Sequence, residues 1–444
     1  MAGGRGTRIS ELFPTIPKPL IEIIDGNGVE RPVLEWEIRS LVAQGFTDIV
    51  LTVSHMADKI KDYFGTGEQL GCHIEYFVED IPLGNAGALF KMRQQLGTEP
   101  FLLLNADAVF EIDFNRFNAF HMKKKQGCGA LVTLFTHPNS HPYDSGIVVS
   151  DESGSVTSWL TKEDARPQWY KNRVNAGLHV IDPAVLDMTI QRTGLELDSI
   201  GTAGADGKTI KVDLDRQILK PLCGTGRMYC YDSPEYVKDM GTPERFYSVS
   251  RDFQNGVVAA KNLSYKQKAI FLDRDGTINK YVGFLRKIED FELIDGVAEA
   301  IRKINESGYL CIVVTNQPVI ARGEVTVEEL QLIHDKMETL LGQAGAYVDA
   351  IYYCPHHPDR GYEGEVVELK IDCDCRKPKP GLILRAAEDF NIDLGASWMI
   401  GDGKNDAGAG KAAGCRTVLI GDEEYEADIT AENLLAAVEE ILGK

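Results

Sequence analysis

Two aspartates, Asp273 and Asp275, occupy alternate positions at the end of the apolar run 269–273. If this run is a β-strand, both residues lie at its carboxyl end, where ligands bind in open α/β sheets. One carboxylate could attack a phosphoryl group, while the other exchanges a proton with the leaving oxygen and then with water. The bland alternative for an isolated pair is a strand-end turn, so the pair needs support from the rest of the chain.

Three segments further along the chain supply that support. Thr315 ends a second apolar run, Lys377 follows an arginine and precedes a proline, and Asp402 and Asp406 follow a third apolar run. In this order the segments resemble the four motifs of the haloacid dehalogenase superfamily, over about residues 269–421. Asp406 fits either a role behind the metal ligands or the start of a helix.

The resemblance implies a two-step phosphatase. Asp273 is the expected nucleophile and Asp275 the general acid and base. Mg²⁺ is expected to bind Asp273, the backbone carbonyl of Asp275 and Asp402, while Thr315 and Lys377 stabilise the transferring oxygens.

Cysteine and histidine residues between these motifs have the spacing of a metal site. Cys354 and His356 form one C-x-H pair, and Cys373 and Cys375 form a C-x-C pair downstream. Four such ligands suit tetrahedral Zn²⁺ and leave no open position, which predicts a structural zinc. His357 is the alternative to His356, and two unrelated thiol pairs are the alternative to a metal site.

The segments DRDGTIN, TNQPVIARG and CDCRKPKPG resemble heptose 1,7-bisphosphate phosphatases and their histidinol-phosphatase relatives. The resemblance implies substrate contacts from the loop Tyr281 to Phe284, from the segment Thr315 to Pro318, which includes Asn316, and from Arg376. Pro318 stands where the first family usually has serine, so only a backbone contact is expected there. Arg322 is a further candidate for a phosphate or hydroxyl contact, and the alternative is an exposed loop arginine.

The first half of the chain carries a different set of motifs. A glycine-rich loop at 2–8 is followed by PKPL at 17–20, and LGNAGAL, NAD, VNAGLHVI and DMGTPERF follow in order. Together they resemble the sugar-1-phosphate nucleotidyltransferases.

This second resemblance implies how a nucleoside triphosphate and a sugar 1-phosphate are bound. Glycines allow close approach to the triphosphate, and cations offset charge as the α-phosphorus is attacked. The expected residues are Gly3, Gly4, Gly6 and Thr7 at the triphosphate; Arg8 and Lys18 as cations; Asp107 and Asp239 at Mg²⁺; Gly84 and Gly87 at the base and ribose; and Lys162, Asn175 and Gly177 at the sugar phosphate. Lys162 has the alternative of a solvated loop lysine, because Thr161 replaces the glutamate that usually precedes it.

In this family a strand precedes the glycine loop, whereas here Met1 stands directly before Ala2. We expect that the natural chain begins upstream. The alternative is a first domain that lacks a core strand and is inactive.

Alternating apolar runs and helical patterns predict an α/β fold with two doubly wound domains, each a mostly parallel sheet covered by helices. The expected boundaries are 1–247 for the nucleotidyltransferase domain, 248–268 for a linker and 269–444 for the phosphatase domain with its zinc loop. Strands are expected at 49–53, 101–107, 130–135, 269–273, 310–315, 349–354 and 397–401, and helices at 33–44, 113–125, 326–341 and 431–442.

Composition limits the classes of partner. The 444 residues contain 47 lysines and arginines against 67 aspartates and glutamates, a net charge of −20. This balance disfavours nucleic acid and anionic membranes, while metal ions and a few cations can still hold phosphates. No run reaches the roughly 20 apolar residues of a membrane span, and nine cysteines are too few for a disulfide scaffold, so we expect a cytosolic protein.

The leading hypothesis is a bifunctional enzyme of nucleotide-heptose synthesis that removes the 7-phosphate of a heptose bisphosphate and then joins the heptose 1-phosphate to a nucleotide. GTP is implied by the resemblance, and an oligomer is possible. One rival pairs a mannose-1-phosphate guanylyltransferase with a histidinol-phosphatase-like domain. The other keeps the phosphatase and makes the first half a non-catalytic sugar-nucleotide sensor.

Overall fold

The computed structural model describes residues 9–106, 108–161, 163–204, 207–421 and 426–443. The chain forms two compact units. Unit 1 comprises Met1–Thr136, Val148–Leu160 and Asn175–Ala259, and unit 2 comprises His137–Ile147, Thr161–Val174 and Ala260–Lys444.

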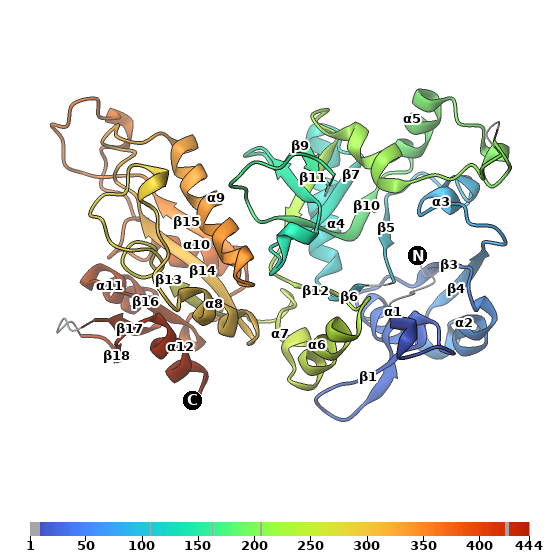
Figure 1. Cartoon of the computed structure of the whole chain (residues 1–444), viewed down its shortest axis with the longest axis horizontal. Coiled ribbons are helices and arrows are strands. Elements are labelled where there is room, and N and C mark those ends of the chain that lie inside the picture. Colours follow the sequence, from blue (N-terminus) through green and yellow to red (C-terminus); the bar gives the residue numbers. More distant parts are fainter. Residues whose placement is uncertain (1–8, 107, 162, 205–206, 422–425, 444) are drawn as a thin grey trace. The chain divides into compact units, whose positions relative to one another are not determined.

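Unit 2 is built on a six-stranded parallel sheet with the order β15-β14-β13-β16-β17-β18 (Figure 1). After β13, the chain adds β14 and then β15 on one side of β13. It then returns and adds β16, β17 and β18 on the other side. This is the doubly wound arrangement expected from the sequence. The strands are β13 (Lys268–Leu272), β14 (Tyr309–Asn316), β15 (Ala350–Cys354), β16 (Trp398–Gly401), β17 (Arg416–Ile420) and β18 (Ile429–Ala431).

Helices cover both faces of this sheet. Alternate side chains of β13 enter different cores: Ile270 and Leu272 pack in one, and Ala269 and Phe271 in the other. A strand buried on both faces has to be apolar at nearly every position, as KAIFL is. The first core receives side chains from α8 (Val297–Asn305), α9 (Val327–Gln343) and α12 (Leu434–Leu442), and the second from α10 (Gly381–Asp389) and α11 (Lys404–Ala413).

Unit 1 contains a six-stranded mixed sheet. Strand β10 runs antiparallel to β5 and to β8, whereas β11 runs parallel to β7. The antiparallel course of β10 departs from the expected parallel arrangement, because apolar runs reveal strands but not their directions. The strands of this sheet are β5 (Phe101–Leu104), β7 (Val132–His137), β8 (Ile147–Ser150), β9 (Val156–Leu160), β10 (Val174–Ile181) and β11 (Met228–Asp232).

Shorter strand pairs complete the first half of the chain. Strands β3 and β4 pair in parallel, and the pairs β1·β2 and β6·β12 are antiparallel. These strands are β1 (Glu22–Ile24), β2 (Glu30–Pro32), β3 (Asp48–Val53), β4 (His73–Val78), β6 (Ala108–Glu111) and β12 (Tyr236–Asp239). The helices are α1 (Val33–Ala43), α2 (Ala57–Phe64), α3 (Gly87–Lys91), α4 (Phe114–Cys128), α5 (Ala184–Thr193), α6 (Pro243–Gln254) and α7 (Val257–Ala260).

Within the described residues, no helix combines the length and the apolarity that crossing a lipid bilayer requires.

Candidate functional site

Asp273 and Lys377 form the centre of a buried charged group in unit 2. Asp273 directly follows β13, and its Oδ1 lies 2.7 Å from Nζ of Lys377. The same Nζ lies 2.6 Å from Oδ1 of Asp406, and Lys377 is only 3% exposed. Burial disfavours the charged lysine, but the two carboxylates raise its pKa above the usual value. Lys377 is thus a buried cation that contacts both Asp273 and Asp406.

Asp402 follows β16 and joins this group at the carboxyl edge of the sheet. Carboxylate oxygens of Asp273, Asp402 and Asp406 lie within 4.8 Å of one another. Burial, together with the neighbouring carboxylates, raises the pKa of both Asp273 and Asp402 to about 6. Gly276 lies so near that a Cβ there would stand 1.9 Å from Oδ2 of Asp402. A clustered set of oxygens with excess negative charge fits Mg²⁺.

Asp275 is not part of that cluster, and its carboxylate accepts hydrogen bonds from several side-chain donors. Its Oδ2 accepts hydrogen bonds from Nη2 of Arg274 at 2.9 Å and from Nε2 of Gln317 at 2.8 Å. Its Oδ1 accepts from Nη2 of Arg274 at 2.9 Å and from Nδ2 of Asn279 at 3.0 Å. Burial opposes ionisation, but Arg274 and these hydrogen bonds lower the pKa of Asp275 below its usual value.

Arg274 is itself fully buried, so its charge is balanced inside the protein. Its Nη1 lies 3.2 Å from Nε2 of His334, a residue of α9. Burial and the charge of Arg274 lower the pKa of His334 to about 3. A neutral His334 can accept a hydrogen bond from Arg274, which fixes the guanidinium behind Asp275.

A pocket of about 220 Å³ opens above the carboxylates. It is lined by Tyr281, Phe284, Asn316 and Arg376 together with the charged group. Thr315 also lines it, although it is only 1% exposed. Most of the residues expected to bind the phosphatase substrate therefore meet in one pocket.

Two of the expected substrate residues have partners within the protein. The side-chain amide of Asn316 donates to the carbonyl of Lys377 and accepts from its N–H, both at 3.0 Å. Arg376 donates from Nη1 to the carbonyl oxygen of His356 at 3.3 Å. Arg322 is 8% exposed and is not among the pocket-lining residues, and its guanidinium lies over the rings of Phe284 and Tyr362.

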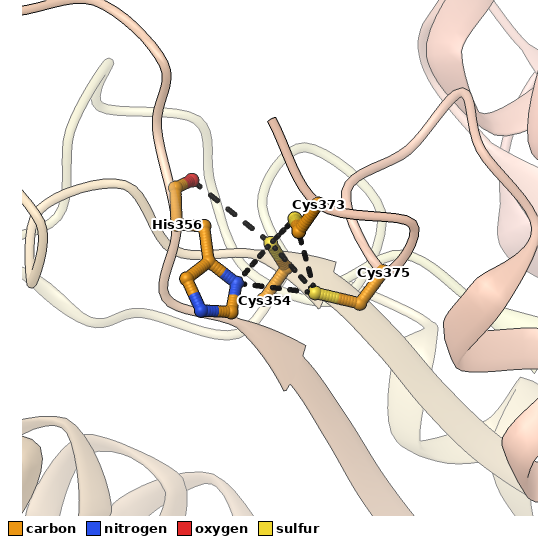
Figure 2. A group of neighbouring side chains, drawn as sticks. All are labelled: Cys354, His356, Cys373 and Cys375. Carbon is orange, nitrogen blue, oxygen red and sulfur yellow. Dashed lines mark hydrogen bonds between the residues drawn. The ribbon is translucent and has the colours of Figure 1, made fainter. Parts of the chain in front are cut away.

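The cysteine and histidine residues expected to bind zinc form a single group (Figure 2). The sulfur atoms of Cys354, Cys373 and Cys375 lie 3.2 to 3.5 Å apart. Nδ1 of His356 lies 3.3 Å from the sulfur of Cys375, whereas Nδ1 of His357 accepts a hydrogen bond from the N–H of Asp359 at 3.2 Å.

These atoms fit a tetrahedral metal site. A Zn–S distance of about 2.3 Å places the sulfurs of a tetrahedron about 3.8 Å apart, slightly more than the distances here. The thiols lose their protons when a metal binds, and a divalent ion would offset the charge of the resulting thiolates. The group can bind a metal, and its three sulfurs and one nitrogen favour zinc.

Unit 1 places two of the expected nucleotide-handling residues together. Nζ of Lys18 lies 3.5 Å from Oδ1 of Asp239, and Arg245 forms an ion pair with Oδ2 of the same carboxylate at 2.5 Å. Burial raises the pKa of Asp239, but the charges of Lys18 and Arg245 outweigh it and the pKa is lowered. Asp239 is paired in register with Ala108, which brings β12 beside β6.

The remaining described residues of this set lie in close contacts. Gly84 packs against the backbone of Val212, and Gly87 against Leu83. Gly177 packs against the side chain of Asn105 and donates its N–H to Oδ1 of Asn175 at 3.2 Å. The expected residues Gly3, Gly4, Gly6, Thr7, Arg8, Asp107 and Lys162 lie outside the described residues.

Sequence reasoning missed Arg274 and did not connect Gln317 with Asp275. Arg274 stands between the two aspartates. Gln317 lies in the segment Thr315 to Pro318, which was expected to contact substrate, and its Nε2 also donates to the Oγ1 of Thr315 at 2.9 Å. Arg274 could have been noticed because it directly follows a buried strand and lies between two aspartates. An arginine buried at such a place needs an acidic partner. Gln317 gave no comparable signal.

Two family models match the chain. The nucleotidyl transferase model matches residues 1–256, and a HAD-hydrolase-like model matches residues 374–439.

Individual relatives match the phosphatase part. The chain is 45% identical over 152 residues to a D-glycero-beta-D-manno-heptose-1,7-bisphosphate 7-phosphatase of Yersinia pestis, a match that covers 34% of this chain and 79% of that protein. The Escherichia coli K12 phosphatase of the same name is also 45% identical over 152 residues, 34% of this chain and 78% of its own.

Solved structures resemble both halves. A D,D-heptose 1.7-bisphosphate phosphatase from B. bronchiseptica, solved with magnesium and phosphate, is 33% identical, with a TM-score of 0.35, and the match covers 40% of this chain and 99% of that one. HddC from Yersinia pseudotuberculosis is 22% identical, with a TM-score of 0.43, and the match covers 57% of this chain and 96% of that one.

Proposed function

We propose a bifunctional enzyme of nucleotide-heptose synthesis, because the chain belongs to two enzyme families. Through residues 1–256 it belongs to the nucleotidyl transferase family. Through its 152-residue match it belongs to the D-glycero-beta-D-manno-heptose-1,7-bisphosphate 7-phosphatase family. It hydrolyses the 7-phosphate of the bisphosphate and transfers a nucleotidyl group to the resulting heptose 1-phosphate. The boundaries 1–247 and 269–444 are our proposal for the two catalytic domains.

The observation that carries the phosphatase step is the meeting of Asp273, Lys377 and Asp402 at the carboxyl ends of β13 and β16. Asp273 attacks the phosphorus, and the bond to the sugar oxygen breaks as an aspartyl-phosphate forms. Lys377 offsets the charge on the transferring oxygens, and Thr315 donates to one of them. Water then attacks the intermediate and releases phosphate.

Asp275 handles the proton in both steps. It donates a proton to the leaving sugar oxygen, and it takes a proton from the attacking water. Its lowered pKa suits the second role, and a negatively charged phosphate entering beside it favours the protonated form needed for the first. Gln317 and Arg274 keep the carboxyl group oriented between the two steps.

The carboxylates of Asp273 and Asp402, with the backbone carbonyl of Asp275, are the residues that would hold Mg²⁺. When bound, the ion offsets the repulsion between the nucleophile and the phosphate. The group of Cys354, His356, Cys373 and Cys375 would hold zinc with no position left for substrate, which is a structural role.

For nucleotidyl transfer we propose that the glycine loop at 2–8 binds the triphosphate and that Lys18 and Arg8 offset its charge. Asp107 and Asp239 would hold the second Mg²⁺, and Lys162, Asn175 and Gly177 would face the sugar phosphate. The sugar phosphate oxygen attacks the α-phosphorus and pyrophosphate leaves. GTP is our proposed donor, and the cytosolic location and an oligomeric state stay predictions.

One experiment on the full-length chain tests the two activities and their rivals. Phosphate release is compared for heptose 1,7-bisphosphate and histidinol phosphate, and nucleotide-sugar formation is followed with each of the four triphosphates and both anomers of heptose 1-phosphate. We expect a preference for the heptose bisphosphate and for GTP. A preference for histidinol phosphate would overturn the phosphatase assignment. Failure to form any nucleotide sugar with Mg²⁺ present would favour a first half that only binds sugar nucleotides.

A further inference from the structure

Arg322 is buried in unit 2 without the partner that a buried arginine usually has. It is 8% exposed, its Nε finds no hydrogen-bond partner among the described residues, and the ion pairs described for this part of the chain do not include it. Its guanidinium instead lies over the ring of Phe284, 4.0 Å from the centroid, and over the ring of Tyr362, 4.5 Å from the centroid. A cation over an aromatic face is stabilising, and Arg322 makes two such contacts.

A second cation lies over the ring of Tyr362. Nζ of Lys370 lies 4.4 Å from the centroid of that ring, and Lys370 is 3% exposed. The lysine also donates to the carbonyl oxygen of Asp359 at 2.9 Å and pairs with Glu365 at 3.4 Å. The order Lys370, Tyr362, Arg322 and Phe284 thus alternates cation and ring, and we call it the cation–ring stack.

The two ends of the stack belong to different functional parts. Tyr362 and Lys370 lie in the loop between Cys354 and Cys373, which the cysteine–histidine group closes. Phe284 lines the substrate pocket and is 40% exposed, although Arg322 covers one face of its ring. The stack is therefore a physical connection between the metal-binding loop and the pocket wall.

Backbone contacts fix the loop against Arg322. The N–H of Val366 donates to the carbonyl oxygen of Ala321 at 3.1 Å. The N–H of Ala321 donates to the carbonyl oxygen of Pro355 at 3.2 Å. At Gly323, which has a φ of +71°, a Cβ would lie 1.9 Å from the carbonyl oxygen of Gly364. Only glycine permits so close an approach, so the loop and the turn after Arg322 are packed as one piece.

We propose that Arg322 is a positioning residue that holds Phe284 as an apolar wall for the sugar ring of the substrate, and that metal binding by the cysteine–histidine loop maintains this wall through the cation–ring stack. An exposed aromatic ring next to the phosphate pocket suits the C–H face of a sugar, whereas Arg322 does not line the pocket. The inference deepens the proposed phosphatase function and rests on it.

The first test uses hydrogen exchange, which needs no substrate. In the full-length, metal-loaded protein, Arg322→Met should increase exchange at backbone amides of 281–286 by about tenfold, since a buried cation–ring contact contributes on that scale. Arg322→Lys, which keeps a cation, should restore part of the protection. Arg302→Met, at an exposed position of α8, is the matched control. Unchanged exchange at 281–286 in Arg322→Met would overturn the proposal.

The second test asks whether the metal acts through the stack. Zinc removal should increase exchange at 281–286 in the wild-type chain but add little in Arg322→Met, because the connection is already broken. Equal additional increases in both proteins would contradict the connection.

The third test separates substrate positioning from chemistry. Arg322→Met should raise KM for heptose 1,7-bisphosphate about tenfold and change kcat by less than about twofold, as expected for lost ground-state binding. Phe284→Leu should do the same, and the double variant should be no worse than either single variant. A fall in kcat with unchanged KM would overturn the positioning role.

Hydrolysis of acetyl phosphate distinguishes failure of the positioning role of Arg322 from failure of the proposed phosphatase function. It contains a reactive phosphoryl group without a sugar, so it reports the chemistry of Asp273 alone. If the wild-type chain hydrolyses acetyl phosphate but not the heptose bisphosphate, the proposed substrate is wrong, while the exchange experiments still decide the role of Arg322.

Discussion

The carboxylate group around Lys377 and the cysteine–histidine group lie in the same unit, and each gathers metal-ligating atoms within 4.8 Å. They differ in how the chain brings those atoms together. Cys354, His356, Cys373 and Cys375 come from one loop and its ends, whereas Asp273 and Asp402 are far apart in sequence and meet because β13 and β16 are neighbours. The cysteine–histidine group closes a loop, whereas the carboxylate group depends on the whole sheet.

The two groups also differ in charge. The carboxylates share their site with a buried lysine, and the pocket above them is open to a substrate. The three thiols and the imidazole provide four ligands, which would fill the tetrahedral coordination of a zinc ion. The comparison teaches that the carboxylate group is arranged for turnover and the cysteine–histidine group for order, and the following variants test that division.

Asp273→Asn should have the largest effect. It removes the nucleophile and should lower phosphatase turnover by about 10⁴-fold or more. Nucleotidyl transfer to heptose 1-phosphate, measured on the same preparation, should be unchanged, and Asp107→Asn should show the reverse pattern. Loss of both activities in either variant would contradict independent sites.

Lys377→Met should damage both activity and stability. It leaves Asp273 and Asp406 buried without their cation, so we expect about 10³-fold lower phosphatase turnover and a loss of about 3 kcal/mol in the free energy of unfolding. Urea denaturation checks the second value. Lys379→Met is the matched control, because Lys379 pairs with Asp372 at the surface. Unfolding at the wild-type urea midpoint would count against a buried ion-pair role for Lys377.

Cys373→Ser should separate order from turnover. Zinc content should fall well below about one equivalent per chain, the loop should become more mobile, and KM should change more than kcat. Metal analysis and steady-state kinetics measure these effects. Cys128→Ser, an exposed cysteine outside the group, is the control. Full zinc stoichiometry in Cys373→Ser would exclude this ligand set.

Gln317→Met should have the smallest effect. It removes the hydrogen bonds to Asp275 and Thr315 and should lower kcat by about tenfold with little change in KM. Gln331→Met, at an exposed position of α9, is the control. If KM changes instead of kcat, Gln317 acts on substrate binding and not on the acid and base.

The sequence predicted the elements that carry the phosphatase site with small errors at their ends. The expected strand at 269–273 is observed as Lys268–Leu272, and the expected helix at 326–341 as Val327–Gln343. Apolar runs and the helix-capping pair Thr326 and Glu329 are formed by residues close together in the chain. Such signals can be read from one sequence without an alignment.

Contacts between distant segments were not predictable in the same way. Arg322 was expected either to contact the substrate or to be an exposed loop arginine, and the structure buries it against rings at 284 and 362 that no motif connects to it. The antiparallel course of β10 was missed for a related reason, because strand direction depends on the path of the chain and not on local composition.

The central claim is that one chain carries out the two reactions in sequence, and phosphorus NMR of a single reaction tests it most directly. Heptose 1,7-bisphosphate, GTP and Mg²⁺ are mixed with the full-length chain, either wild-type or Asp273→Asn. For the wild type we predict that the 7-phosphate signal is lost first and that pyrophosphate and a nucleotide-heptose follow. Asp273→Asn should form neither from the bisphosphate but should form both when heptose 1-phosphate is supplied. Nucleotide-heptose formation from the bisphosphate by Asp273→Asn, or no product from heptose 1-phosphate by either protein, would contradict the account.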